Sequence, residues 1–227
     1  MAAKQKQHKE RSKRRVVLVF GEDDNDREAV KHLVQAIWPE VPSIEPRRAP
    51  LILQKGRDAA EQRKNAAAVA NVVRGSSVTV DVVAVLAHQD CDAVEPAHVA
   101  LSEQIEMELG DAGVPLPCAA TPAWEIESWW YLWPEAVAQV NPRWCKLARE
   151  GEEVGRIVNV KERLIKDLRP KAKDKRTADY VESDAPRIAS TIRERNHVND
   201  VRAKSASFMR FRKRVLEIRD ALASEVA

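Results

Sequence analysis

The chain has 227 residues, a formal net charge of +3 and a charged fraction of 32%. This length is enough for a full hydrophobic core. No apolar run approaches the roughly 20 residues that span a bilayer, and the first residues lack the apolar core of a signal peptide, so we expect no membrane association. The three cysteines have no CxxC spacing, which argues against a disulfide framework or a zinc site and favours a reducing cytoplasm.

Residues 1–15 are rich in lysine and arginine and almost free of apolar side chains. Such a segment cannot pack against a core, so it is predicted to be a disordered basic tail. Its charge would attract phosphate groups, or it would only keep this end of the chain in solvent. The sequence leaves both interpretations open.

The first predicted element is a strand at Val16–Phe20, where five consecutive apolar residues indicate burial on both faces of a parallel sheet. An acidic run, Glu22–Asp26, follows after one glycine. Asn25 and Glu28 fit a capping box, and apolar residues at helical spacing continue to Ile37, so a helix is expected to begin here. Open α/β sheets bind ligands at the carboxyl ends of their strands, which makes the acidic run a candidate site.

A second buried strand is predicted at Val78–Ala87, and it leads into His88-Gln89-Asp90-Cys91-Asp92. Asp90 and Asp92 can project toward a common space, and they can meet Glu22 if the two strands are parallel neighbours. Other predicted elements are a short strand at 51–53, a helix at 57–74, a helix at 95–109, a strand near a sheet edge at 114–121 and a helix beginning at Thr121. This alternation predicts an α/β fold.

Four tryptophans gather between residues 124 and 133, too many to remain in water, so this stretch is predicted to be largely buried. Glu125 and Glu127 lie among them. A carboxylate beside such a surface costs several kcal/mol unless it is paired or binds a cation. These two glutamates are therefore further site candidates.

From about residue 146 the sequence changes to charged helices, predicted at 160–168, 185–195 and 207–223. The last is amphipathic and is expected to pack on the body of the protein. A basic, proline-containing loop lies between the first two. It is either a solvated connector or a nucleic-acid contact, and the predicted contact residues are Lys171, Lys173, Lys175, Arg176 and Lys204.

Glu22 with Asp26 four residues later resembles the first motif of the TOPRIM family, and Asp90-x-Asp92 resembles the second. The segment Trp124–Trp129 is similar to one in small bacterial TOPRIM-like proteins related to the nuclease half of OLD (overcoming lysogenisation defect) proteins. The resemblance covers roughly residues 16–145. It departs from the family pattern at Asp23, where the first motif normally has glycine.

The resemblance implies a TOPRIM-like parallel sheet flanked by helices, with residues 16–145 as the catalytic domain and 146–227 as an α-helical C-terminal appendage. It implies a nuclease that hydrolyses phosphodiester bonds of DNA or RNA with Mg²⁺ or Mn²⁺, as two ions, and that acts against phage or mobile DNA. The implied metal ligands are Glu22, Asp26, Asp90, Asp92, Glu125 and Glu127, with Glu22, Asp90 and Glu127 catalytic. A lysine near the phosphate is also expected; Lys161, Lys171 and Lys204 are candidates.

The chain has no Walker-type GxxxxGK[ST] motif, so the ATPase with which such nucleases often act would be a separate ABC- or AAA-type protein. Two other interpretations remain open. One is a receiver-like phosphoacceptor, in which Asp90 or Asp92 takes the phosphate and Thr121 assists. The other is a metal-free interaction module in which the carboxylates are structural. His88, beside the site, is interpreted as a structural residue.

Overall fold

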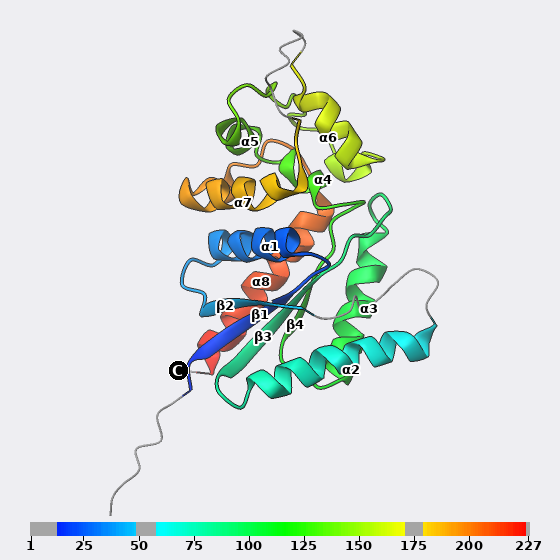
Figure 1. Cartoon of the computed structure of the whole chain (residues 1–227), viewed down its shortest axis with the longest axis vertical. Coiled ribbons are helices and arrows are strands. Elements are labelled where there is room, and N and C mark those ends of the chain that lie inside the picture. The colour runs from blue at the N-terminus through cyan, green and yellow to red at the C-terminus, as the bar shows by residue number, and fades with distance from the viewer. Residues whose placement is uncertain (1–12, 49–57, 171–178, 226–227) are drawn as a thin grey trace, which may run out of the picture.

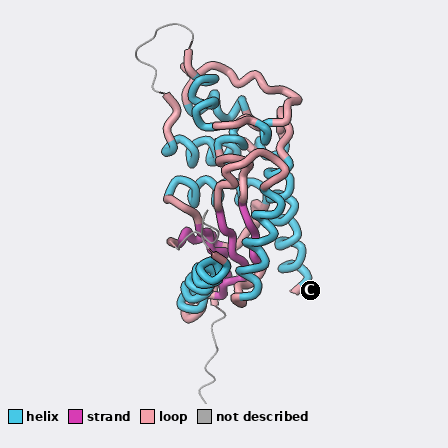
Figure 2. The backbone as a smooth tube through the Cα atoms, turned by 90° about the vertical axis from the view of Figure 1, so that its right-hand side faces the viewer, coloured by secondary structure: helices cyan, strands magenta, loops and turns pink. Residues whose placement is uncertain are grey.

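Four parallel strands form one sheet with helices on both faces in the computed structural model, which describes residues 13–48, 58–170 and 179–225 (Figure 1). The strands are β1 (Arg15–Phe20), β2 (Ser43–Arg47), β3 (Asp81–His88) and β4 (Pro117–Ala120), and their order in the sheet is β2-β1-β3-β4. The α/β class, the parallel sheet and a helical C-terminal part are as predicted. Figure 2 shows the strands with helices on either side of them.

The helices surround this sheet and build a second, largely helical layer beyond it. They are α1 (Asp24–Ile37), α2 (Ala59–Ser76), α3 (His98–Asp111), α4 (Glu127–Trp130), α5 (Pro134–Val140), α6 (Val160–Leu168), α7 (Ala185–Glu194) and α8 (Ala206–Ser224), with short 3₁₀ helices η1 (Val154–Arg156), η2 (Glu182–Asp184) and η3 (His197–Asn199). Among the described residues, no helix has both the length and the apolar content that crossing a bilayer requires.

β1 is buried on both faces, as its continuous apolar run predicts. Its alternate side chains belong to two separate clusters of buried residues. Leu18 packs with α2 and α3 on one face, whereas Val17 and Val19 pack with α1 and the C-terminal helices on the other. A two-residue alternation sends successive side chains to opposite faces, so a strand covered on both faces needs apolar residues at every position.

The register between β1 and β3 brings their carboxyl ends to the same edge of the sheet. Val17 pairs with Ala84 and Phe20 with Ala87, in parallel. The loops that follow the two strands therefore emerge side by side, although 68 positions separate their first residues, 21 and 89, in the sequence. This adjacency is the condition under which the two acidic segments can meet.

One of the two strands beside β1, the edge strand β2, was not predicted from the sequence. β2 lies in the proline-rich stretch 38–50 and contains Pro46, which is tolerated because β2 is an edge strand. The strand predicted at 51–53 and the first twelve residues of the predicted basic tail lie outside the described residues. β4 is at the other edge of the sheet, as expected for its prolines.

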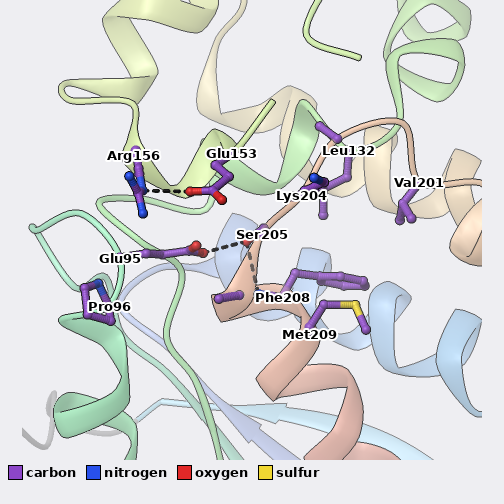
Figure 3. Close-up of a pocket in the computed structure, with 12 residues that line it drawn as sticks. Glu95, Pro96, Leu132, Glu153, Arg156, Val201, Lys204, Ser205, Phe208 and Met209 are labelled. Atoms are coloured by element: carbon purple, nitrogen blue, oxygen red, sulfur yellow. Dashed lines mark hydrogen bonds and ion pairs between the residues drawn. The ribbon is translucent and has the colours of Figure 1, made fainter. Parts of the chain in front are cut away.

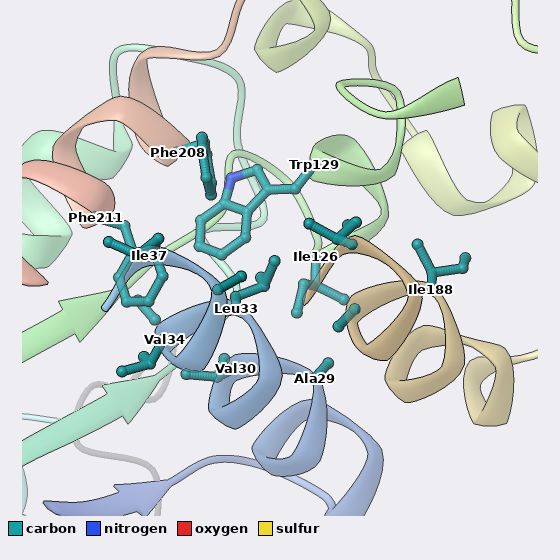
Figure 4. Packing of buried hydrophobic residues seen from close by; sticks show 14 of the residues in the cluster. Ala29, Val30, Leu33, Val34, Ile37, Ile126, Trp129, Ile188, Phe208 and Phe211 are labelled. Carbon is teal, nitrogen blue, oxygen red and sulfur yellow. The ribbon is translucent and has the colours of Figure 1, made fainter. Parts of the chain in front are cut away.

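The C-terminal helices share the core of the sheet rather than forming one of their own. α7 packs along α1, and α8 packs on α1 and β4. Trp129 stacks on Phe211 with ring centroids 5.3 Å apart and meets Phe208 edge-on at 5.5 Å (Figure 4). The predicted packing of the last helix on the body is confirmed, and three of the four clustered tryptophans are fully buried. Trp124, the fourth, is only partly buried.

Candidate functional site

A pocket of about 660 Å³ lies where the loops after β1 and β3 emerge from the sheet. Six acidic residues predicted from the sequence line it: Glu22, Asp26, Asp90, Asp92, Glu125 and Glu127. Asp23, Glu182 and Lys161 also line it. The acids come from three segments separated along the chain, so the fold brings the predicted carboxylates together in one place.

The first acidic segment is held by its own helix and by a buried arginine. Asp23, not Asn25, caps α1, and its side chain accepts a hydrogen bond of 2.9 Å from the amide of Asp26. The predicted capping box is therefore wrong, because the helix begins two residues earlier than its pattern indicated. Asp23 has a φ of −126°, an extended conformation that does not require glycine.

Arg27 fixes the loop that carries Glu22. Its side chain is 4% exposed, and its guanidinium donates a hydrogen bond of 2.7 Å to the carbonyl of Gly21 and pairs with Asp24. Asp24 also pairs with Arg48 at 2.9 Å. These contacts turn Asp24 away from the acidic pocket, so this candidate of the acidic run has a structural role.

The second and third acidic segments are joined by backbone hydrogen bonds that extend the pairing of β3 with β4 into the loops. The amide of Asp92 donates a hydrogen bond to the carbonyl of Trp124 at 2.9 Å, and the amide of Trp124 donates one to the carbonyl of Ala93 at 2.8 Å. Asp92 and Trp124 have φ of +52° and +63°, in the left-handed region that a bulky residue rarely adopts. Strained backbone of this kind is concentrated at functional sites.

This pairing also corrects the helix predicted from Thr121. The segment 121–126 is a loop, and only the single turn of α4, beginning at Glu127, is helical. The positive φ of Trp124 interrupts any helix there. Glu125 in the loop and Glu127 in α4 thereby lie beside Asp90 and Asp92.

The electrostatics of the pocket are those of crowded carboxylates. Burial raises the pKa of Asp90 well above its usual range, and nearby Asp26, Glu127, Glu125 and Glu22 raise it further. Burial likewise raises the pKa of Asp26 and of Glu127 to about 7. In such surroundings the ionised form of a carboxylate is disfavoured, so these groups tend to bind either a proton or a cation.

His88 lies next to two of these carboxylates. Its Nε2 is 3.4 Å from Asp90 Oδ1 and its Nδ1 is 3.6 Å from Asp26 Oδ2, and the imidazole is fully buried. Burial lowers the pKa of His88 to about 4, so the ring is neutral at neutral pH and these contacts are not ion pairs. Neither ring nitrogen has a hydrogen-bond partner among the described residues.

Lys161, at the start of α6, is the basic residue of the pocket lining, and it pairs with Glu182 of η2. Burial by itself would lower the pKa of Lys161, but the bond to Glu182 and the nearby carboxylates outweigh it, and the pKa is raised. Lys161 was one of three candidate lysines. Glu182 was not identified, because no spacing relates it to the acidic motifs.

The donor chemistry of the pocket fits a hard divalent cation such as Mg²⁺ or Mn²⁺, which prefer carboxylate oxygens. Asp90 Oδ1 and Glu125 Oε2 are buried and have no hydrogen-bond partner among the described residues. In the part of the chain that is described, however, no three or more His, Cys, Asp or Glu side chains form a group that could hold a metal ion. The carboxylates line one pocket without closing around one point.

Comparison with known proteins identified no relative of this chain. No family model, curated protein or solved structure matches this chain. The interpretation of the pocket therefore depends on its own residues and on the motif resemblance.

Of the predicted nucleic-acid contacts, Lys204 is the one within the described residues, and it does not line the acidic pocket. Lys204 lines a different pocket, of about 580 Å³, together with Glu95, Arg156 and Met209 (Figure 3). The four basic residues predicted in the loop after α6 fall within 171–178, outside the described residues. Only Lys161 among the candidate lysines therefore contributes to the acidic pocket in the described structure.

The receiver interpretation gains no support from Thr121. This residue is 2% exposed, and its hydroxyl is hydrogen-bonded to Ser102. Thr121 does not line the acidic pocket. A receiver would need this hydroxyl near its phosphoacceptor aspartate.

Proposed function

We propose that this protein is a TOPRIM-like nuclease that uses Mg²⁺ or Mn²⁺ to hydrolyse phosphodiester bonds of DNA or RNA. The observation that carries the proposal is the gathering of acids from three separate segments in one pocket at the carboxyl ends of β1 and β3. Ligands of open α/β sheets bind at such an edge.

The acidic residues would divide between two cations. Glu22, Asp90 and Asp92 would hold one, and a second would be held with help from Asp26, Glu125 or Glu127. Bound Mg²⁺ or Mn²⁺ supplies positive charge for the phosphate and lowers the pKa of a bound water. The raised pKa values of Asp26, Asp90 and Glu127 support this assignment, because a bound cation would compensate the burial, and the smaller carboxylate repulsion, that raise them.

Two residues of the chain would act on the substrate itself. Lys161 would leave Glu182 and donate hydrogen bonds to a phosphate oxygen, as a compact cation with three donors. Glu22, which follows the central strand, would accept a proton from the attacking water or serve as a ligand. Neither role requires movement of the sheet.

The biological setting follows from the resemblance alone. We propose a cytoplasmic protein that acts against phage or other mobile DNA together with a separate ABC- or AAA-type ATPase. The metal site can be tested without that partner.

The deciding experiment compares variants with the wild type in two measurements. One is Mn²⁺ binding by titration calorimetry, and the other is cutting of supercoiled plasmid or structured RNA. Glu22→Gln and Asp90→Asn should each weaken Mn²⁺ binding and abolish cutting. Asp24→Asn is the matched control, since Asp24 belongs to the same acidic run but pairs with Arg27 and Arg48. Its metal binding and activity should equal those of the wild type.

Two outcomes would contradict the proposal. Wild-type protein that binds no Mn²⁺ would exclude the metal site. Equal cutting by the wild type, Glu22→Gln and Asp90→Asn would show a contaminating nuclease. Metal binding serves as the primary measurement because cutting can also depend on the ATPase.

A further inference from the structure

A chain of hydrogen bonds that passes through Tyr180, in the C-terminal part of the protein, ends at Glu127 of the acidic pocket. The hydroxyl of Tyr180 donates to Glu127 Oε1 at 3.0 Å. The indole Nε1 of Trp130 donates to the same hydroxyl at 3.2 Å. Because Trp130 can only donate, the hydroxyl hydrogen of Tyr180 must point at Glu127.

All three residues are buried, so their geometry is restricted. Glu127 is 4% exposed, Tyr180 2% and Trp130 0%. Glu127 and Trp130 are the first and last residues of the single turn α4. Tyr180 contacts both, although it lies 53 residues after Glu127 and 50 after Trp130. The ring of Tyr180 is also held by Trp144, at 6.2 Å between centroids.

We infer that Tyr180 is a positioning residue, which orients the Glu127 carboxylate toward the pocket by holding one of its oxygens. This inference rests on the proposed function. The hydroxyl contacts Oε1 and does not engage the second oxygen of Glu127. A one-turn helix such as α4 has little rigidity of its own, so the contact with Tyr180 would restrict the position of the Glu127 side chain.

The same C-terminal segment brings a second residue to the site. Two positions after Tyr180, Glu182 lines the pocket and pairs with Lys161. The segment 180–182 thus serves both Glu127 and the basic residue of the pocket. The helical C-terminal part would then be a component of the site.

The chain contains a matched control, because it has two tyrosines. Tyr131 is also buried, at 1% exposed, and its hydroxyl donates to Asp167 at 3.1 Å. Asp167 does not line the acidic pocket. Tyr131→Phe and Tyr180→Phe therefore each remove one buried hydroxyl that donates to a carboxylate, and only Tyr180→Phe does so at the site.

The test is Mn²⁺ titration of the full-length variants, with the melting temperature recorded in parallel. Both variants should melt at slightly lower temperature. Tyr180→Phe should bind Mn²⁺ about tenfold more weakly than the wild type, which is the lower end of the effect seen when a residue that orients a metal ligand is lost. Tyr131→Phe should bind Mn²⁺ like the wild type. Tyr180→Phe should have no further effect in a Glu127→Gln background, since its action passes through Glu127.

Each contrary result has its own meaning. Wild-type affinity in Tyr180→Phe, or equal weakening in Tyr131→Phe, would overturn the positioning role and leave the metal site intact. A full tenfold loss that persists in the Glu127→Gln background would show that Tyr180 acts elsewhere. Absence of Mn²⁺ binding in the wild type would overturn the proposed function, and the positioning role with it.

Discussion

His88 approaches Asp90 to 3.4 Å without hydrogen-bonding to it. The imidazole is fully buried, and its other nitrogen is 3.6 Å from Asp26. A neutral ring whose two nitrogens lack partners is costly in a protein interior. A buried polar group retained in this position is typical of a site where function, rather than stability, determines the residue.

Replacing His88 by leucine should therefore stabilise the metal-free protein. We expect the free energy of unfolding to rise by about 1 kcal/mol, because the unpaired nitrogens are removed at nearly constant volume. Urea denaturation measures this change. His32→Leu is the control, since His32 is partly exposed and has a contact of 3.3 Å with Gln35. A less stable His88→Leu protein would mean that the carboxylate contacts outweigh the missing hydrogen bonds.

Stability of the metal-free protein should fall as the pH rises from about 5 to about 8. Folded Asp26 and Glu127 keep their protons up to a pKa of about 7, whereas their ordinary values are 3.8 and 4.5. The folded state therefore binds more protons in this window, and stability is lost as they leave. Each group contributes roughly 1.4 kcal/mol for each pH unit over which it titrates.

His88 opposes this trend at the lower end of the range. Its pKa of about 4 lies below the ordinary 6.5, so its contribution is present above pH 6.5 and is lost as the pH falls toward 4. The decline should thus be steepest between about pH 6.5 and pH 7, above the range in which His88 opposes it and before Asp26 and Glu127 have lost their protons. Glu127→Gln should flatten it and Glu28→Gln, on the surface, should not. Urea midpoints that rise with pH would contradict the assignment.

Gly155→Ala should destabilise the protein through Glu95. A Cβ at position 155 would lie 2.0 Å from Glu95 Cδ. Glu95 accepts a hydrogen bond of 2.9 Å from Ser205 (Figure 3). It also accepts one of 2.8 Å from the amide of Ser207, at the start of α8. Displacing it should cost about 1–3 kcal/mol, measured by urea denaturation.

The control for this variant is Gly110→Ala in α3. A Cβ there meets no atom within 4 Å. Alanine is the better helix former, so this variant should gain up to about 1 kcal/mol. A Gly155→Ala protein as stable as the wild type would mean that Glu95 is not needed at the start of α8.

Lys161→Ala should lower the rate of phosphodiester cleavage at least about tenfold, which corresponds to ~1.4 kcal/mol of transition-state stabilisation. Lys161 is the basic residue of the acidic pocket. Lys166→Ala, an exposed lysine of the same helix, is the charge-matched control. Single-turnover cleavage measures both rates. An equal decrease in the two variants would indicate only a loss of general positive charge.

Phe211→Ala should destabilise the whole protein by about 3–5 kcal/mol in one cooperative transition. Its ring stacks on Trp129 at the junction of α8 with the body. Met209→Ala in the same helix should change stability by less than about 0.5 kcal/mol, because Met209 is 51% exposed. Two separate transitions in Phe211→Ala would show that α8 unfolds independently.

Several features of this protein follow from local sequence. The apolar run of β1 predicts a strand buried on both faces, since a residue pattern of period two reports directly on which faces are covered. The acids after β1 and β3 could be assigned to one edge because parallel strands end there together. The spacing of Phe208 and Phe211 predicts the buried face of α8.

Other features depend on tertiary packing. Glu182 joins the pocket, and Tyr180 reaches Glu127, from a segment that carries no acidic motif. The turn around Trp124 replaces a predicted helix with a left-handed loop. β2 was missed because its proline argues against a strand, and only the edge position removes that objection. Periodicity reports on the neighbours of a residue along its own element. Which distant segments meet is decided by how whole faces pack, and spacing in the sequence does not encode that.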